Sequence, residues 1–244
     1  MLEVQNLVKH FGDVKALDKL SFKAHDGQIT GILGPNGAGK TTALRVLYGL
    51  LKAEQGNGFI DGIDSQLEPQ KARKQIGIFP DKFGLYERLT AREQVAYFAE
   101  LHGLKGEEKK QALDAVINKL DIADIADRKC EGFSQGQRMK VILAQALVHE
   151  PQNLILDEPT RGLDVMSTRI LRDVLLGLKQ QGKCILFSSH VMQEVAALCD
   201  QVIVVAGGKI AAVGTPDELC KQTGKTELEE AFVALIGSDE GIAA

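Results

Sequence analysis

Several features are scarce in this chain of 244 residues, and each shortage removes a class of proteins. No run of about 18 or more uncharged apolar residues occurs, so we expect no membrane-spanning helix. The first residues lack the apolar core of a secretory signal, so we expect none. Four cysteines are widely spaced without a C-x-x-C pattern, which favours free thiols in a reducing cytosol. The net charge is −4 and the acidic residues are dispersed, so we expect no nucleic-acid partner.

Strand-like and helix-like segments alternate in the outer thirds of the chain, and the middle is mainly helical. Strand-like residues in the first third occupy 2–8, 17–24, 28–33, 56–60 and 75–79, with helical segments at 43–50 and 69–75. Helical periodicity predicts helices over 90–102, 107–120 and 135–148, the first opened by the capping-box pattern T-A-R-E. The last third predicts strands at 153–156, 184–187, 202–205 and 209–213, and helices at 166–179, 191–198 and 226–236. Continuously apolar strands such as LIL and VIVV indicate a parallel sheet covered on both faces.

The segment GPNGAGKTT at residues 34–42 is the most informative part of the sequence. It fits G-x-x-x-x-G-K-[ST] and lies between a strand-like and a helix-like segment, which predicts a phosphate-binding loop. Glycines let successive backbone N–H groups point at one anion, and the following helix adds its positive dipole end. The expected binding residues are Gly34, Pro35, Asn36, Gly37, Ala38, Gly39, Lys40, Thr41 and Thr42. Lys40 would reach the β- and γ-phosphates of a nucleotide, and the Thr41 hydroxyl would ligate Mg²⁺.

The sequence LILDE at residues 154–158 supplies the second half of such a site. An apolar strand that ends in a carboxylate is the usual partner of a phosphate loop, so Asp157 would hold Mg²⁺ directly or through water. Glu158 lies one residue further on, where it could act as general base and polarise an attacking water.

Three more motifs accompany these two: FSQGQ at 133–137, GLD at 162–164 and SSH at 188–190. Taken in this order, the motifs resemble those of the ATP-binding cassette (ABC) ATPases, the motor subunits of ABC transporters, over essentially the whole chain. The resemblance implies an α/β fold: a P-loop NTPase core with a mostly parallel sheet, an N-terminal antiparallel β subdomain and an inserted helical subdomain at about 82–150. It implies one ABC ATPase domain over 1–236 and a flexible tail at 237–244.

The resemblance also implies how ATP is held. Two cassettes would face each other head to tail, so that the phosphate loop of one and the FSQGQ signature of the other enclose each ATP. The signature would contribute Ser134, Gly136 and Gln137, with Asp164 from the GLD motif. His190 would contact the γ-phosphate and hold Glu158 and the water in line.

Phe11 lies where the family places an aromatic residue that stacks on adenine. The alternative is that Phe11 is an ordinary core residue, and the adjacent His10 is a weaker contender for the same role.

Two departures from the family pattern stand out. Phe133 and Gln135 replace the Leu and Gly of the usual LSGGQ signature. Asp81 follows the strand at 76–79, where the family usually has a Gln that binds Mg²⁺ and signals to the membrane partner. We therefore expect Asp81 to contact the metal or to serve in coupling, with an ordinary turn carboxylate as the alternative.

The function expected from this resemblance is that of an ATP-binding and ATP-hydrolysing subunit with ATP and Mg²⁺ as cofactors. The segments GLYERLT and TELEEAFVALIG resemble the bacterial branch that exports drugs, sodium or other cargo. The expected partners are an integral membrane permease on a separate chain and a second ABC subunit, in a homodimer. The chain would then lie peripherally at the cytoplasmic face of the inner (plasma) membrane. The alternatives are a soluble ABC ATPase outside transport and a phosphate-loop kinase or GTPase, which would leave the FSQGQ signature unexplained.

Overall fold

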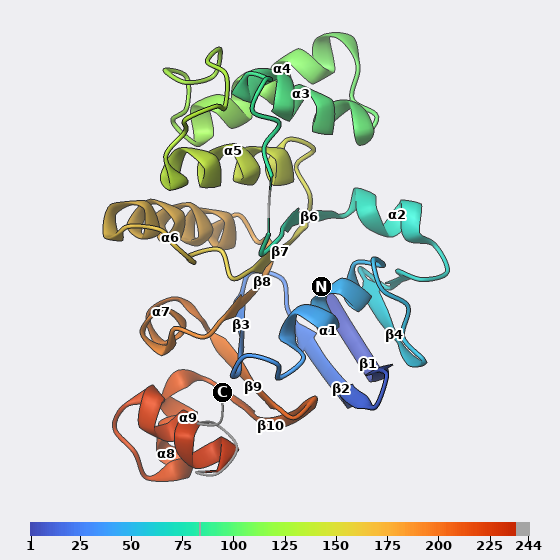
Figure 1. The fold of residues 1–244 in the computed structure, drawn as a ribbon, viewed down its shortest axis with the longest axis vertical. Helices are drawn as coiled ribbons and strands as arrows, with labels where there is room; N and C mark the ends of the chain where they lie inside the picture. The colour runs from blue at the N-terminus through green and yellow to red at the C-terminus, as the bar shows by residue number, and fades with distance from the viewer. Residues whose placement is uncertain (83, 238–244) are drawn as a thin grey trace.

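The computed structural model describes residues 1–82 and 84–237, and within these ranges the strands form two sheets (Figure 1). The larger sheet has the order β10-β9-β3-β8-β7-β6, and its five strands from β9 to β6 are parallel. These strands are β3 (Ile29–Leu33), β6 (Ile76–Phe79), β7 (Asn153–Asp157), β8 (Cys184–Ser189) and β9 (Gln201–Ala206), and β10 (Lys209–Gly214) pairs antiparallel to β9. The smaller sheet is antiparallel in the order β2-β1-β4-β5, with β1 (Leu2–Phe11), β2 (Val14–Ala24), β4 (Gln55–Ile60) and β5 (Ile63–Asp64).

Both faces of the parallel sheet are buried, because successive residues of each strand enter two different hydrophobic cores. In β3, Ile29 and Leu33 belong to the core shared with the helical region, whereas Ile32 belongs to the core beneath the smaller sheet and the first helix. In β7, Leu154 likewise belongs to the core shared with the helical region, and Ile155 belongs to the other core. Burial on both faces explains why these strands are continuously apolar rather than alternating.

Helices surround this sheet, and three of them gather at one end of the molecule (Figure 1). The helices are α1 (Lys40–Leu47), α2 (Pro69–Lys74), α3 (Ala91–Leu101), α4 (Gly106–Lys119), α5 (Gln135–Leu147), α6 (Val165–Gln180), α7 (Met192–Leu198), α8 (Pro216–Thr223) and α9 (Leu228–Ile236). The group at the end consists of α3, α4 and α5, and it meets the sheet where α5 packs on β6. Within the described ranges no helix has the length and apolar character needed to cross a bilayer.

The fold class predicted from the sequence is confirmed: an α/β protein with a phosphate loop after β3, an antiparallel N-terminal sheet and a mostly parallel core. The capping box predicted for the helix at 90 is also confirmed, because the Thr90 side chain accepts from the Glu93 N–H and Glu93 accepts from the Thr90 N–H. The limits of the domain, 1–236, and of the helical insertion, about 82–150, stay predictions. Residues 238–244 of the expected tail lie outside the described residues.

Several element boundaries differ from the expectation, and one helix was not predicted. The helix after the phosphate loop begins at Lys40 and ends at Leu47, three residues earlier at each end than the apolar pattern indicated. Helix α8 was not predicted, although its signal is in the sequence. Thr215 caps it, Pro216 occupies its first position, and Glu218 completes a capping box.

Candidate functional site

The loop between β3 and α1 makes a tight turn that its glycines permit. Gly39 caps α1 with φ +102°, in the left-handed region, and a Cβ there would lie 2.4 Å from the Ala16 carbonyl oxygen. A Cβ on Gly34 would lie 2.4 Å from the Val205 carbonyl oxygen. The motif glycines therefore let the loop fit between β2 and β9, which directs the start of α1 into the cavity described below.

Lys40 is the first residue of α1, and its ammonium group turns back over the loop. The Nζ donates to the carbonyl oxygens of Gly34 at 2.7 Å and Pro35 at 3.2 Å. It also lies 3.6 Å from Glu158 Oε1. Burial lowers the pKa of Lys40, while the charges of Glu158 and Asp157 oppose that shift. These contacts keep a buried cation at the centre of the loop.

Asp157 ends strand β7, and hydroxyl groups from two neighbouring elements hold its carboxylate. Ser188 Oγ, in β8, donates to Asp157 Oδ1 at 2.7 Å, and Thr41 Oγ1 donates to the same oxygen at 3.1 Å. Burial raises the pKa of Asp157, and these two hydrogen bonds act in the opposite direction. The pairing of Thr41 with Asp157 therefore places two hard oxygen atoms, which could act as metal ligands, side by side at the carboxyl ends of the parallel strands.

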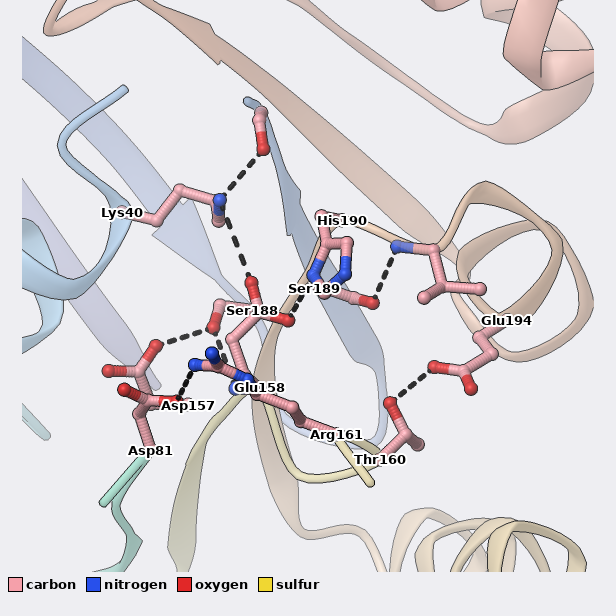
Figure 2. Close-up of polar contacts among 12 residues, drawn as sticks. Lys40, Asp81, Asp157, Glu158, Thr160, Arg161, Ser188, Ser189, His190 and Glu194 are labelled. Carbon is pink, nitrogen blue, oxygen red and sulfur yellow. Dashed lines mark hydrogen bonds and ion pairs between the residues drawn. The ribbon is translucent and has the colours of Figure 1, made fainter. Parts of the chain in front are cut away.

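Glu158 lies at the centre of the site, between a lysine and a histidine (Figure 2). Its carboxylate places Oε1 3.6 Å from Lys40 Nζ and Oε2 2.6 Å from His190 Nδ1. Its backbone has φ +51°, which is sparsely populated for a residue with a side chain. The Glu158 N–H donates to Ser188 Oγ at 3.0 Å and to the Ser188 carbonyl at 3.2 Å, which holds this conformation.

A second ion pair lies at the edge of the site. Asp81, in the loop after β6, accepts from Arg161 Nη1 at 3.1 Å, and Arg161 belongs to the loop between β7 and α6 (Figure 2). The Asp81 side chain is 16% exposed and that of Arg161 is 64% exposed. The pair therefore joins two loops that approach the phosphate loop from different strands.

These groups line one cavity of about 300 Å³. The lining residues are Ala16, Asn36, Gly37, Ala38, Gly39, Lys40, Thr41, Thr42, Asp81, Glu158, Arg161 and His190. The structure thus brings residues 36–42 of the phosphate loop together with Asp81, Glu158 and His190, whereas the expected binding residues Gly34 and Pro35 are not among the lining residues. Asp157 adjoins the cavity through its hydrogen bond with Thr41.

The signature residues do not line this cavity, and they form a separate group with the GLD motif. Ser134 caps α5 and forms a capping box with Gln137, whose side-chain oxygen accepts from the Ser134 N–H at 3.0 Å. A Cβ on Gly136 would lie 2.3 Å from Ser167 Oγ, so the starts of α5 and α6 touch. Asp164 caps α6 by accepting from the Ser167 N–H at 2.8 Å. The two motifs therefore share one surface of the molecule.

Phe11 is also outside the lining residues of the cavity. It ends β1 with 49% of its surface exposed, and Lys9 Nζ lies 5.5 Å from the ring centroid. Its exposure contradicts the alternative of a core residue. His10 instead pairs with Glu54, with Nδ1 2.7 Å from Glu54 Oε2.

Three residues in or beside the site were not singled out from the sequence. Ser188 lies in the SSH motif and orients both Asp157 and the Glu158 backbone. Arg161 lies in the segment DEPTRGLD. A basic residue shortly after the acids Asp157 and Glu158 could have indicated that it belongs to the site. Glu194 in α7 accepts from Thr160 Oγ1 at 2.6 Å, and this contact across 34 residues left no signal in the sequence.

Comparisons with known proteins agree with this arrangement. The family model described as ABC transporter matches residues 17–161. NatA of Bacillus subtilis (strain 168), named an ABC transporter ATP-binding protein, is 39% identical over 239 residues, 96% of this chain and 97% of the relative. The linearmycin resistance ATP-binding protein LnrL of the same organism is 34% identical over 98% of this chain and 79% of the relative. The chain belongs to the ABC transporter family.

Solved structures extend this comparison to three dimensions. An ATP-binding subunit of an ABC transporter superposes with a TM-score of 0.87 at 29% identity, covering 96% of this chain and 99% of the other. A dimeric ATP-binding cassette in a post-hydrolysis state with ADP and Pi superposes with a TM-score of 0.79 at 25% identity, covering 88% and 98%. The protein is an ABC-type ATPase with a P-loop NTPase fold.

Proposed function

We propose that the cavity beside the phosphate loop binds ATP, and that this chain is the ATP-hydrolysing subunit of a membrane exporter. The observation that carries the proposal is the position of Glu158. Its carboxylate is held between Lys40 and His190 at the cavity that Lys40 and the phosphate loop line. A carboxylate beside a buried cation and a phosphate-binding loop suits hydrolysis of a phosphoanhydride.

The residues present fit a triphosphate. The backbone of the phosphate loop and the start of α1 form one wall of the cavity, and helix N-termini favour anions. Lys40 would exchange its contacts with backbone carbonyls for contacts with phosphate oxygens. Thr41 and Asp157 offer hard oxygen ligands side by side, which fit Mg²⁺ shared with phosphates, and Asp81 is a further candidate ligand. Bound Mg²⁺ would neutralise phosphate charge.

The hydrolytic step follows from the contacts of Glu158. Its carboxylate would accept a proton from the water that attacks the γ-phosphorus, and the bond to the bridging oxygen of ADP would break. Since carboxylates only accept hydrogen bonds, His190 donates from Nδ1 to Glu158 Oε2, which leaves Oε1 on the side of Lys40. His190 thereby orients the base, and it would contact the γ-phosphate as well.

A complete site would need a second copy of this chain. Ser134, Gly136, Gln137 and Asp164 gather on one surface away from the cavity. If two copies met head to tail, this surface of one copy would cover the ATP held by the other. The dimeric cassette among the similar structures supports this arrangement. Phe11, exposed at the end of β1, would stack on the adenine.

The direction of transport rests on the relatives. LnrL is named for linearmycin resistance, and export is the transport direction that removes a toxic compound from a cell. We therefore propose that this subunit works with a separate membrane permease, bound peripherally at the cytoplasmic face of the inner membrane. Co-purification with an integral membrane protein from detergent extracts is the expected result, and recovery without one would favour a soluble ABC ATPase.

The dimer is tested by the dependence of ATP turnover on protein concentration. If hydrolysis needs two copies, the rate per litre should rise with the square of the chain concentration well below the dimerisation constant. A strictly linear rise down to the lowest measurable concentration, with only monomer present by light scattering, would contradict a site shared between two copies.

A further inference from the structure

The ion pair between Arg161 and Asp81 adds a cation and an anion to the same cavity (Figure 2). Among the described lining residues, Lys40 and Arg161 are the lysine and arginine, and Asp81 and Glu158 are the carboxylates. Lys40 already faces Glu158, so the charge of Asp81 is balanced by Arg161. A polyphosphate entering this cavity would meet an uncompensated carboxylate if Arg161 were absent.

Asp81 lines the same cavity as Glu158. Both carboxylates would repel the phosphate oxygens of a nucleotide bound there. Arg161 is therefore the group that permits an aspartate at this position of the cavity.

Arg161 is also free to change partner. Its side chain is 64% exposed, and within the described ranges its guanidinium makes one hydrogen bond, the one to Asp81. An exposed ion pair is weak, because water screens it and the long side chain loses rotamer freedom. A guanidinium binds phosphate through two parallel N–H groups, and a polyphosphate carries more charge than one carboxylate.

We propose that Arg161 is a nucleotide-binding residue, held by Asp81 until a polyphosphate enters the cavity and then transferred from the carboxylate to a phosphate oxygen. Asp81 is released by the same event and becomes available to a metal ion carried with the phosphates. The exchange would couple nucleotide entry to the loop that leads from β6 to the helices α3, α4 and α5. This inference rests on the proposed location of the ATP site.

Calorimetric titration of ATP and AMP into four purified full-length chains tests this exchange: wild type, Arg161→Gln, Asp81→Asn and the double variant. Arg161→Gln should weaken ATP binding about tenfold, because it removes a charge-assisted contact and leaves Asp81 unpaired. The affinity for AMP, which lacks the β- and γ-phosphates, should change by less than about twofold. In the double variant ATP affinity should recover to about threefold below wild type, since the repulsive carboxylate is gone.

A matched control removes an arginine from an exposed ion pair elsewhere. Arg92, in α3, pairs with Asp127 at 2.8 Å, and Arg92→Gln should leave the affinities for ATP and AMP unchanged. Thermal melting of each variant would confirm folding.

Equal losses for ATP and AMP, no loss for ATP, or strictly additive effects in the double variant would each overturn the exchange. Lys40→Ala separates the two proposals. If Lys40→Ala weakens ATP binding and Arg161→Gln does not, the exchange is wrong and the site stands. If neither change weakens binding, the proposed ATP site itself is wrong.

Discussion

Two histidines stacked between the helical region and the sheet predict a pH dependence of folding stability. The rings of His102, at the end of α3, and His149, after α5, lie with centroids 3.4 Å apart at an interplanar angle of 7°. His149 Nε2 lies 3.1 Å from the carbonyl oxygen of Ile76, the first residue of β6, so this nitrogen is the donor. The other nitrogen, Nδ1, is buried without a hydrogen-bond partner in the described part of the chain. Protonating it would bury an unpaired charge.

The size of this effect on the free energy of unfolding follows from the pKa shift of His149. Burial, aided by the nearby charge of His102, lowers the pKa of His149 from its usual value of 6.5 to about 4. The folded-state pKa is the lower one, so between these values the unfolded chain binds the additional proton. The free energy of unfolding therefore falls as the pH drops from about 6.5 to about 4. At about 1.4 kcal/mol per pKa unit, the loss attributable to His149 is about 2 kcal/mol between about pH 7.5 and about pH 5.

Urea unfolding at the two pH values, for wild type and His149→Gln, measures this loss. Glutamine can still donate to the Ile76 carbonyl but does not titrate. On acidification the free energy of unfolding of the variant should therefore fall by about 2 kcal/mol less than that of wild type. His25→Gln is the matched control, because His25 is exposed after β2 and should leave the pH dependence unchanged. An identical pH dependence in wild type and His149→Gln would refute the reasoning.

Four further changes have definite expected outcomes. Lys40→Ala should lower ATP affinity about tenfold or more by calorimetry, since a charge-assisted contact to phosphate is lost, and an unchanged affinity would remove Lys40 from the site. Ser134→Arg should leave the ATP affinity of the monomer intact and block dimer formation in light scattering; a loss of monomer affinity would argue against the head-to-tail arrangement. Gly77→Ala should reduce the free energy of unfolding by about 1–3 kcal/mol, because its Cβ would lie 2.2 Å from the Ala146 carbonyl of α5. Gly177→Ala, in open space within α6, should instead stabilise by up to about 1 kcal/mol, and equal effects of both changes would refute the packing argument.

Local patterns in the sequence were sufficient for most of the fold. The capping box at Thr90 and the apolar strand that ends at Asp157 predicted elements that the structure contains, because hydrogen bonding at helix ends and burial on both faces are decided by nearby residues. Helix α8 was missed although its cap at Thr215 is of the same kind, so the signal was present and overlooked.

Local sequence patterns did not predict the contacts between distant segments. Arg161 and Asp81 are separated by 80 positions, and nothing near either residue indicates their ion pair. The approach of Gly136 to Ser167 likewise depends on how α5 and α6 cross. Motif order indicated which residues share the cavity, whereas the partner of each charge follows only from the packing of loops.

Replacing Glu158 by Gln tests the proposed chemistry most directly, because Gln keeps the shape of the side chain and removes the base. ATP binding, measured by calorimetry, should stay within about threefold of wild type, while turnover should fall about 10²–10⁴-fold. Glu100 of α3 forms an exposed ion pair with Lys109 of α4, and Glu100→Gln should change neither quantity. Wild-type turnover in Glu158→Gln would contradict the assignment of Glu158 as general base in this cavity.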